Sequence, residues 1–346
     1  MALKKIRKII VGFQEITRSH YHFAVSNRGN RDLGISLTVS GWLLFAFFFV
    51  LFENQPENLL PCCNFTDLFS QFTIFHFFMT FFFFTLCISK NLGRYKKKRT
   101  LLKHSFSCKK FSKVLLRAVF AIISVYSLAL SRIWNPEVDN SILYITDAMW
   151  IWVLLRLSGI RLNKLSVVGI FLGTSSVLYM YFNNIAWSTP GGFIFGILSG
   201  FTLGVITILT SYLIEFVPVR IICFYHSVLG LVLSFILAVS IGGISAFQNI
   251  DFGDFVSLGI SGITFSIALY SVIRAFHYLE SYVIGALAFL FHVFIECIHY
   301  AFTQEMPSTI TIIGTLGLLI SALIILITTE AFSNTHDELY SIDKDH

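Results

Sequence analysis

The sequence predicts an all-α polytopic membrane protein with ten transmembrane helices arranged as two inverted five-helix repeats. The first observation is composition: the 346 residues are 55% hydrophobic and only 13% charged, whereas a soluble domain carries roughly 25% charged residues. The second is a series of ten apolar segments separated by short polar loops. The third is charge asymmetry: when the loops are assigned alternately to two sides of a membrane, all 25 lysines and arginines except Arg132 fall on one side.

Each apolar segment is close to the length that spans the hydrocarbon core of a bilayer, roughly 30 Å thick. Backbone amides have no water to bond in lipid, so each segment is predicted to be a helix and not an open strand. The predicted helices are residues 35–53, 67–89, 114–133, 141–157, 165–183, 191–214, 219–241, 255–276, 281–303 and 308–329.

Loop charges predict the orientation. Lysines and arginines gather in the N-terminal segment and in the loop after the second helix, which contains the run KKKR at 96–99. Cytoplasmic loops carry this excess of positive charge. We therefore expect both termini to be cytoplasmic, in a multi-pass protein of the cell (inner) membrane. The KKKR run is interpreted as a topology anchor beside an anionic leaflet, with a nucleic-acid role as the weaker alternative.

The chain is predicted to divide into a basic N-terminus (1–34), a first repeat (35–183) with a basic cytoplasmic loop (90–113), a second repeat (191–329) and an acidic cytoplasmic tail (330–346). Five helices per repeat is an odd number, so the two repeats have opposite orientations in the membrane. Inverted repeats are typical of secondary transporters, whose substrate sites lie near the midplane where the halves meet.

Weak internal similarity supports the repeat. Arg132 ends the third predicted helix and Arg274 the eighth, and an acidic residue opens the helix that follows each of them. A glycine-containing helix then closes each unit, with Gly169 in the first and Gly314 in the second. Inversion would place Arg132 and Arg274 on opposite faces, which accounts for the single arginine on the outer side.

Residues 114–329 resemble the drug/metabolite transporter superfamily, in particular its EamA-type ten-helix permeases. The resemblance rests on the end of the second repeat, where QEMPS at 304–308 precedes Gly314. The corresponding turn of the first repeat, RLSG at 156–159, lacks the acidic residue. The resemblance implies ten helices, cytoplasmic termini and substrate uptake or exchange by alternating access.

Members of that superfamily carry amino acids, nucleotide sugars, purines and other metabolites. The Phe- and Ile-rich composition is typical of the AT-rich genomes of obligate intracellular bacteria, which have permeases of this superfamily that exchange S-adenosylmethionine for S-adenosylhomocysteine. The leading expectation is therefore S-adenosylmethionine uptake in that exchange. The alternatives are a permease for an amino acid, nucleotide or nucleotide sugar, or a membrane-embedded enzyme.

Two carboxylates lie inside predicted helices, where a charge is costly and indicates function. Asp147 lies in the fourth helix and Glu296 in the ninth, with His292 and His299 on the same helical face as Glu296. Because these helices are counterparts in the repeat, both carboxylates are expected near one central cavity, binding a cationic or zwitterionic substrate or carrying protons. The alternative is a buried, protonated, hydrogen-bonded carboxyl.

Aromatic residues could stack a planar ring of the substrate. Trp150 lies one turn from Asp147, and Tyr144 and Tyr270 are further candidates for substrate binding. Ordinary packing is the alternative for each of them.

The proton or gating candidates are His76, His226, His299 and Arg132. His76 and His226 occupy equivalent helices, two and seven, where each could bond substrate or shuttle protons or be a satisfied interior histidine. Arg132 could hold an anionic group or pair with a neighbouring acidic residue.

Glycines at 191, 192, 196, 200 and 204 mark one face of the sixth predicted helix, a spacing typical of close helix packing. The sequence contains no P-loop, HExxH zinc motif or nucleophile elbow. We expect no cofactor and no resident metal, although His292, Glu296 and His299 would be the ligands under the enzyme alternative. The expected partners are a small-molecule substrate and the lipid bilayer, not nucleic acid, with a homodimer left open.

Overall fold

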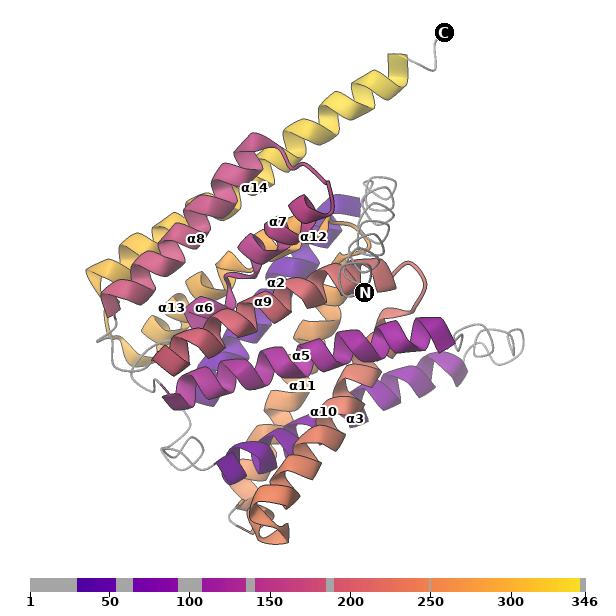
Figure 1. The fold of residues 1–346 in the computed structure, drawn as a ribbon, viewed down its shortest axis with the longest axis vertical. Helices are drawn as coiled ribbons and strands as arrows, with labels where there is room; N and C mark the ends of the chain where they lie inside the picture. The colour runs from indigo at the N-terminus through magenta and orange to yellow at the C-terminus, as the bar shows by residue number, and fades with distance from the viewer. Residues whose placement is uncertain are drawn as a thin grey trace, which may run out of the picture.

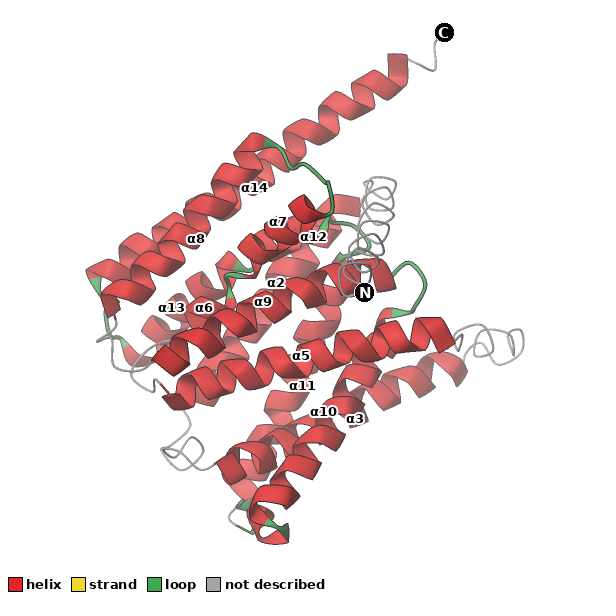
Figure 2. Cartoon of the chain, in the orientation of Figure 1, coloured by secondary structure: helices red, strands yellow, loops and turns green. Residues whose placement is uncertain are grey.

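The computed structural model describes residues 30–53, 65–92, 108–134, 141–184, 190–248 and 250–342, and in these ranges it contains helices and loops but no strand (Figures 1 and 2). The α-helices are α2 (Arg31–Glu53), α3 (Phe65–Leu92), α5 (Cys108–Trp134), α6 (Ser141–Tyr144), α7 (Asp147–Leu157), α8 (Lys164–Asn184), α9 (Pro190–Leu213), α10 (Val219–Gly242), α11 (Phe252–Ala275), α12 (Ser281–Leu287), α13 (Phe289–Thr303) and α14 (Thr309–Ile342), and one 3₁₀ turn covers Ile244–Phe247.

In this described part, nine helical segments are long and apolar enough to cross a membrane, and the prediction of an all-α polytopic membrane protein is confirmed. Their outward side chains suit lipid. On α3, for example, Phe77, Phe81 and Phe84 are each at least half exposed, which in water would leave a large apolar surface uncovered. Helix α14 continues to Ile342 and so extends into the segment predicted as the tail.

The predicted fourth helix, 141–157, is not one helix. It is interrupted at Ile145 and Thr146, between α6 and α7. The backbone N–H and the hydroxyl of Thr146 both donate to the carbonyl of Leu143, at 3.2 and 2.8 Å. In a continuous helix that carbonyl accepts from residue 147 instead. The turn at Thr146 therefore ends α6 and makes Asp147 the first residue of α7.

The corresponding segment of the second half is divided more gently. Between α12 and α13 the N–H of Ala288 is shared by the carbonyls of Ile284 and Gly285, at 3.2 and 3.1 Å. The chain keeps its direction there, and Ser281–Thr303 remains a single membrane-length span. Only the first of these two segments thus has a true break.

Helices from distant parts of the sequence pack in pairs. Helix α3 lies along α10, α5 along α9, α8 along α14 and α2 along α11. In Figure 1, α8 and α14 form one edge of the molecule and α3 and α10 lie toward the other, with α9 and α12 between them. Interhelical hydrogen bonds reinforce the α5–α9 pair, where Ser124 and Ser199 each donate from Oγ to the carbonyl of the other, at 2.9 and 2.8 Å.

Glycines on α9 bring that helix against α6 and α7. A Cβ added to Gly200 would lie 2.8 Å from the carbonyl oxygen of Leu143 and would overlap the hydroxyl of Thr146. Gly196 and Gly204 make similarly close approaches, to Leu143 and to Trp150. This close packing, expected from the glycine spacing, holds the broken segment against the centre of the bundle.

Candidate functional site

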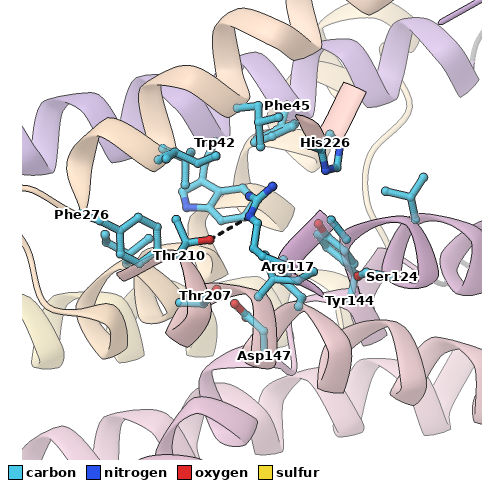
Figure 3. Close-up of a pocket in the computed structure, with 18 of the residues that line it drawn as sticks. Trp42, Phe45, Arg117, Ser124, Tyr144, Asp147, Thr207, Thr210, His226 and Phe276 are labelled. Atoms are coloured by element: carbon cyan, nitrogen blue, oxygen red, sulfur yellow. Dashed lines mark hydrogen bonds between the residues drawn. The ribbon is translucent and has the colours of Figure 1, made fainter. Parts of the chain in front are cut away.

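A cavity lies at the centre of the bundle, lined by residues of α2, α5, α6, α7, α9, α10, α11 and α12 (Figure 3). Water-sized spheres can occupy about 60 Å³ of it, and the wider empty volume of about 620 Å³ includes open solvent. Most of the lining is apolar or aromatic. The polar lining side chains are Arg117, Ser124, Tyr144, Asp147, Thr207, Thr210 and His226.

Arg117 enters the cavity from α5. Its side chain is 2% exposed, and its Nε donates to the hydroxyl of Thr210 on α9 at 3.0 Å, the bond drawn in Figure 3. One of its terminal nitrogens is buried without a hydrogen-bond partner. One turn earlier, Lys113 donates to the Tyr212 hydroxyl at 2.7 Å, so α5 and α9 are joined by two basic side chains on one face of α5. A guanidinium held in this way can still donate to an anion.

Asp147 enters from the break between α6 and α7. Its side chain is 1% exposed, and its Oδ1 is buried without a hydrogen-bond partner. The position at the start of α7 places the carboxylate at the positive end of a helix dipole. Gly285 of α12 lies beside it, at a position where a Cβ would be 3.6 Å from Asp147 Oδ2. The carboxylate is thus held in the interior with an oxygen available to a ligand.

His226 reaches the cavity from α10. It is 3% exposed, and neither ring nitrogen has a hydrogen-bond partner. His76 on α3 lies beside it, with ring centroids 6.3 Å apart, and its Nδ1 is 2.7 Å from the Phe72 carbonyl. The two histidines, predicted to lie on equivalent helices, are neighbours in the structure. Only His226 lines the cavity.

Aromatic rings form part of the apolar lining. Trp42 and Phe45 come from α2, with centroids 5.3 Å apart, and Phe265 of α11 meets Phe45 edge-on at 4.7 Å. Trp42 is 5% exposed, yet its indole Nε1 is buried without a hydrogen-bond partner. The lining therefore offers aromatic surface together with a free N–H donor.

Of the aromatic substrate candidates, only Tyr144 lines the cavity. The ring of Trp150 packs edge-on against Phe201 of α9, with centroids 5.2 Å apart, and Tyr270 packs against the main hydrophobic core. Neither Trp150 nor Tyr270 lines the cavity.

Glu296 does not line the cavity with Asp147. It is 21% exposed at the side chain and lies on α13 with its Oε1 3.4 Å from Nε2 of the buried His292. The helical face expected for these residues is therefore present, but it does not lead to the cavity. His299, one turn further on, accepts at its carbonyl from the Thr303 hydroxyl. Arg132 lies in α5, and its side chain is outside the described residues.

Among the described residues, no group of three histidine, cysteine or acidic side chains is close enough to hold a metal ion. His292, Glu296 and His299 therefore do not gather as the metal ligands considered under the enzyme alternative.

Sequence reasoning missed Arg117, Trp42 and the two threonines of α9 as site residues. The charge pattern assigns Arg117, one turn into the third predicted helix, to the cytoplasmic side, but its buried bond to Thr210 excludes a role as an exposed anchor. The available signal was a charge within the apolar span Phe111–Ser131. Trp42 gave no signal, because a tryptophan in an apolar run is usually packing.

Comparison with known proteins bears on the fold and on part of the sequence. No curated protein matches the chain. A solved structure described only as "Crystal structure of protein" is similar over 86% of this chain and 98% of its own, with a TM-score of 0.59 at 13% sequence identity, which shows a shared fold. Residues 190–327 match the family model of the EamA-like transporters. Over that second half, the chain is similar to the EamA-like transporter family of membrane permeases.

Proposed function

We propose that this protein is a secondary transporter that moves a small polar metabolite across the membrane by alternating access, with the central cavity as its substrate site. One observation carries the proposal. Four buried side chains of the lining, Trp42, Arg117, Asp147 and His226, have polar atoms without hydrogen-bond partners. Buried polar groups are nearly always satisfied, so these atoms suit the bonds of a bound ligand.

The helix packing supports alternating access. If α2 to α8 form one five-helix repeat and α9 to α14 the other, the packing of α5 on α9 has its counterpart in the packing of α11 on α2. The α3–α10 and α8–α14 pairs then join equivalent helices of the two repeats. Such an arrangement places the cavity between two inverted halves that can rock against each other.

The candidate substrate is S-adenosylmethionine, taken up in exchange for S-adenosylhomocysteine. Beyond the family resemblance, the cavity supports this choice in two ways. The carboxylate of Asp147 suits the ammonium and sulfonium groups, and the rings of Trp42 and Phe45 suit an adenine. The transporter is proposed to lie in the cell inner membrane with both termini cytoplasmic, which follows the loop charges.

Uptake into vesicles tests this function. Purified protein in proteoliposomes loaded with S-adenosylhomocysteine should take up labelled S-adenosylmethionine faster than empty or protein-free vesicles. External excess S-adenosylhomocysteine should suppress the uptake. If S-adenosylmethionine is not taken up but another metabolite of a broad panel is, the transport function is kept and the proposed substrate is wrong. If no compound is taken up, the proposed transport function is wrong.

A further inference from the structure

The cavity presents a basic and an acidic side chain on different helices, Arg117 on α5 and Asp147 on α7. We infer that the site selects dipolar substrates, which place an anionic group on Arg117 and a cationic group on Asp147. This inference rests on the proposed transport function and specifies the chemical class of its substrate.

The environment of Arg117 indicates the anionic end. Its Nε is engaged by Thr210, while a terminal nitrogen has no partner and the side chain is almost fully buried. A guanidinium presents five N–H donors in a rigid fork that matches a carboxylate or phosphate. With Nε bonded to Thr210, the unpartnered terminal nitrogen is available to a ligand. The unpartnered N–H of Trp42 adds another donor to the same lining.

The environment of Asp147 indicates the cationic end. An ionised carboxylate only accepts hydrogen bonds, and Oδ1 of Asp147 is buried without a donor. Figure 3 shows the side chain directed into the same pocket as Arg117, from a different helix. An ammonium supplies both the N–H donors and the positive counter-charge that this carboxylate lacks.

Arg117 and Asp147 do not neutralise each other directly. Within the described residues, neither takes part in an ion pair. The other titratable side chains of the described lining are Tyr144 and His226, and neither forms an ion pair with Arg117 or Asp147. A ligand with only one charge would leave the opposite protein charge buried and uncompensated. A dipolar ligand compensates both, so selectivity follows from the cost of the wrong ligand.

Transport by the native protein in proteoliposomes tests the substrate class with four labelled sets. The dipolar set contains the neutral amino acids, S-adenosylmethionine and S-adenosylhomocysteine; the others are anions (monocarboxylates and nucleotides), cations (polyamines) and uncharged compounds (sugars and nucleosides). Uptake confined to the dipolar set is expected. Uptake of another set without uptake of the dipolar set overturns the inference about substrate class but keeps the transport function. If no set is taken up, the proposed transport function itself is wrong.

Matched analogues then assign the two ends. For the dipolar compound that is taken up, its methyl ester lacks the anion and its N-acetyl derivative lacks the ammonium. If that compound is S-adenosylmethionine, whose sulfonium would remain, the analogues are made from S-adenosylhomocysteine instead, which has no sulfonium. Each should compete with uptake by the native protein at least about tenfold more weakly than the parent compound. Equal competition by all three compounds contradicts the inference, and this test does not depend on any variant folding.

Two isosteric variants sharpen the assignment. Arg117→Gln should lower uptake of the parent compound and raise the relative uptake of the methyl ester, and Asp147→Asn should do the same for the N-acetyl derivative. Arg161→Gln and Glu305→Gln alter exposed charges outside the cavity and serve as controls. If both site variants are present in the membrane and neither changes the relative uptake of the analogues, the roles given to the two residues are wrong.

Discussion

The α6–α7 segment of the first half and the α12–α13 segment of the second half differ in backbone and in the side chains they place inside the bundle. In the first half, α6 and α7 are separated by a turn at Thr146, and the residue that follows the turn is Asp147, which lines the cavity. In the second half, α12 and α13 remain one span, and the residue that opens α13 is Phe289, which is fully buried in the core. The acidic residue of that segment, Glu296, lies two turns further on, against His292.

We infer from this difference that the two segments have different roles. A true break leaves backbone N–H and C=O groups outside the helical hydrogen-bond pattern and places an ionisable side chain in the interior. Transporters build substrate sites from discontinuous helices of this kind. A continuous helix with a buried aromatic residue at the same place packs against its neighbours without forming a polar site. We therefore assign the polar contacts with substrate to the first segment, whereas the second contributes the apolar Ile284 to the cavity lining and otherwise supports the bundle.

Asp147→Asn should give the largest effect on uptake. The substitution keeps the shape of the side chain but removes the acid, so uptake should fall by about 100-fold, equivalent to about 2.8 kcal/mol at about 1.4 kcal/mol per tenfold. Thermal stability should be unchanged or higher, because a buried charge without an ionic partner is costly. Initial uptake rates and melting temperatures of the purified protein provide the measurement, with Glu305→Gln as control. Normal uptake would remove Asp147 from the site.

Gly200→Ala should disturb the first segment through its packing. The added Cβ meets the hydroxyl of Thr146 and the backbone carbonyl of Leu143, so α9 must move away from the break, at a cost of about 1–3 kcal/mol. Gly173→Ala, on α8, is the matched change against the second segment, because the added Cβ meets the ring of Phe289 and lies 2.7 Å from Ser321 Oγ. Both should lower the melting temperature, but only Gly200→Ala should also weaken substrate binding. Equal loss of binding would erase the distinction between the halves.

Phe289→Leu should lower stability by up to about 1.5 kcal/mol, as for a hydrophobic exchange in a packed core. Its KM for the transported compound should stay within twofold of the native value, roughly the scatter expected for distant sites. Thermal unfolding and uptake kinetics measure the two quantities separately. A large rise in KM with unchanged stability would show that the second segment also contacts substrate.

Glu296→Gln should have the smallest effect. Glu296 is partly exposed and its contact with His292 spans 3.4 Å, and ion pairs of this exposure contribute about 0.2–1 kcal/mol. Uptake should therefore fall by less than about fivefold. A loss as large as that of Asp147→Asn would restore Glu296 as an equal partner in the site.

The helices could be predicted from the sequence because hydropathy is a local property. Nine spans lie within a few residues of their predicted bounds. The break at Thr146 could not be predicted, since it depends on a backbone turn packed against Gly200 of α9, which lies 54 residues further along the chain (200 − 146).

The site was predicted in part for a similar reason. Asp147, Tyr144 and His226 line the cavity, and the cost of polar groups in lipid had singled out Asp147 beforehand. Arg117 could not be assigned from sequence, because an arginine near a helix end can either extend to the interface or turn inward. Only its contact with Thr210 decides between the two.

Substrate protection of a cavity thiol tests the central claim most directly. In a protein whose six native cysteines are replaced by serine, Thr207→Cys places one thiol in the lining of the cavity, and Ser308→Cys places it instead in an exposed loop. The transported compound should slow maleimide labelling at 207 and leave labelling at 308 unchanged. Labelling at 207 that proceeds at the same rate with saturating substrate would contradict the assignment of this cavity as the substrate site.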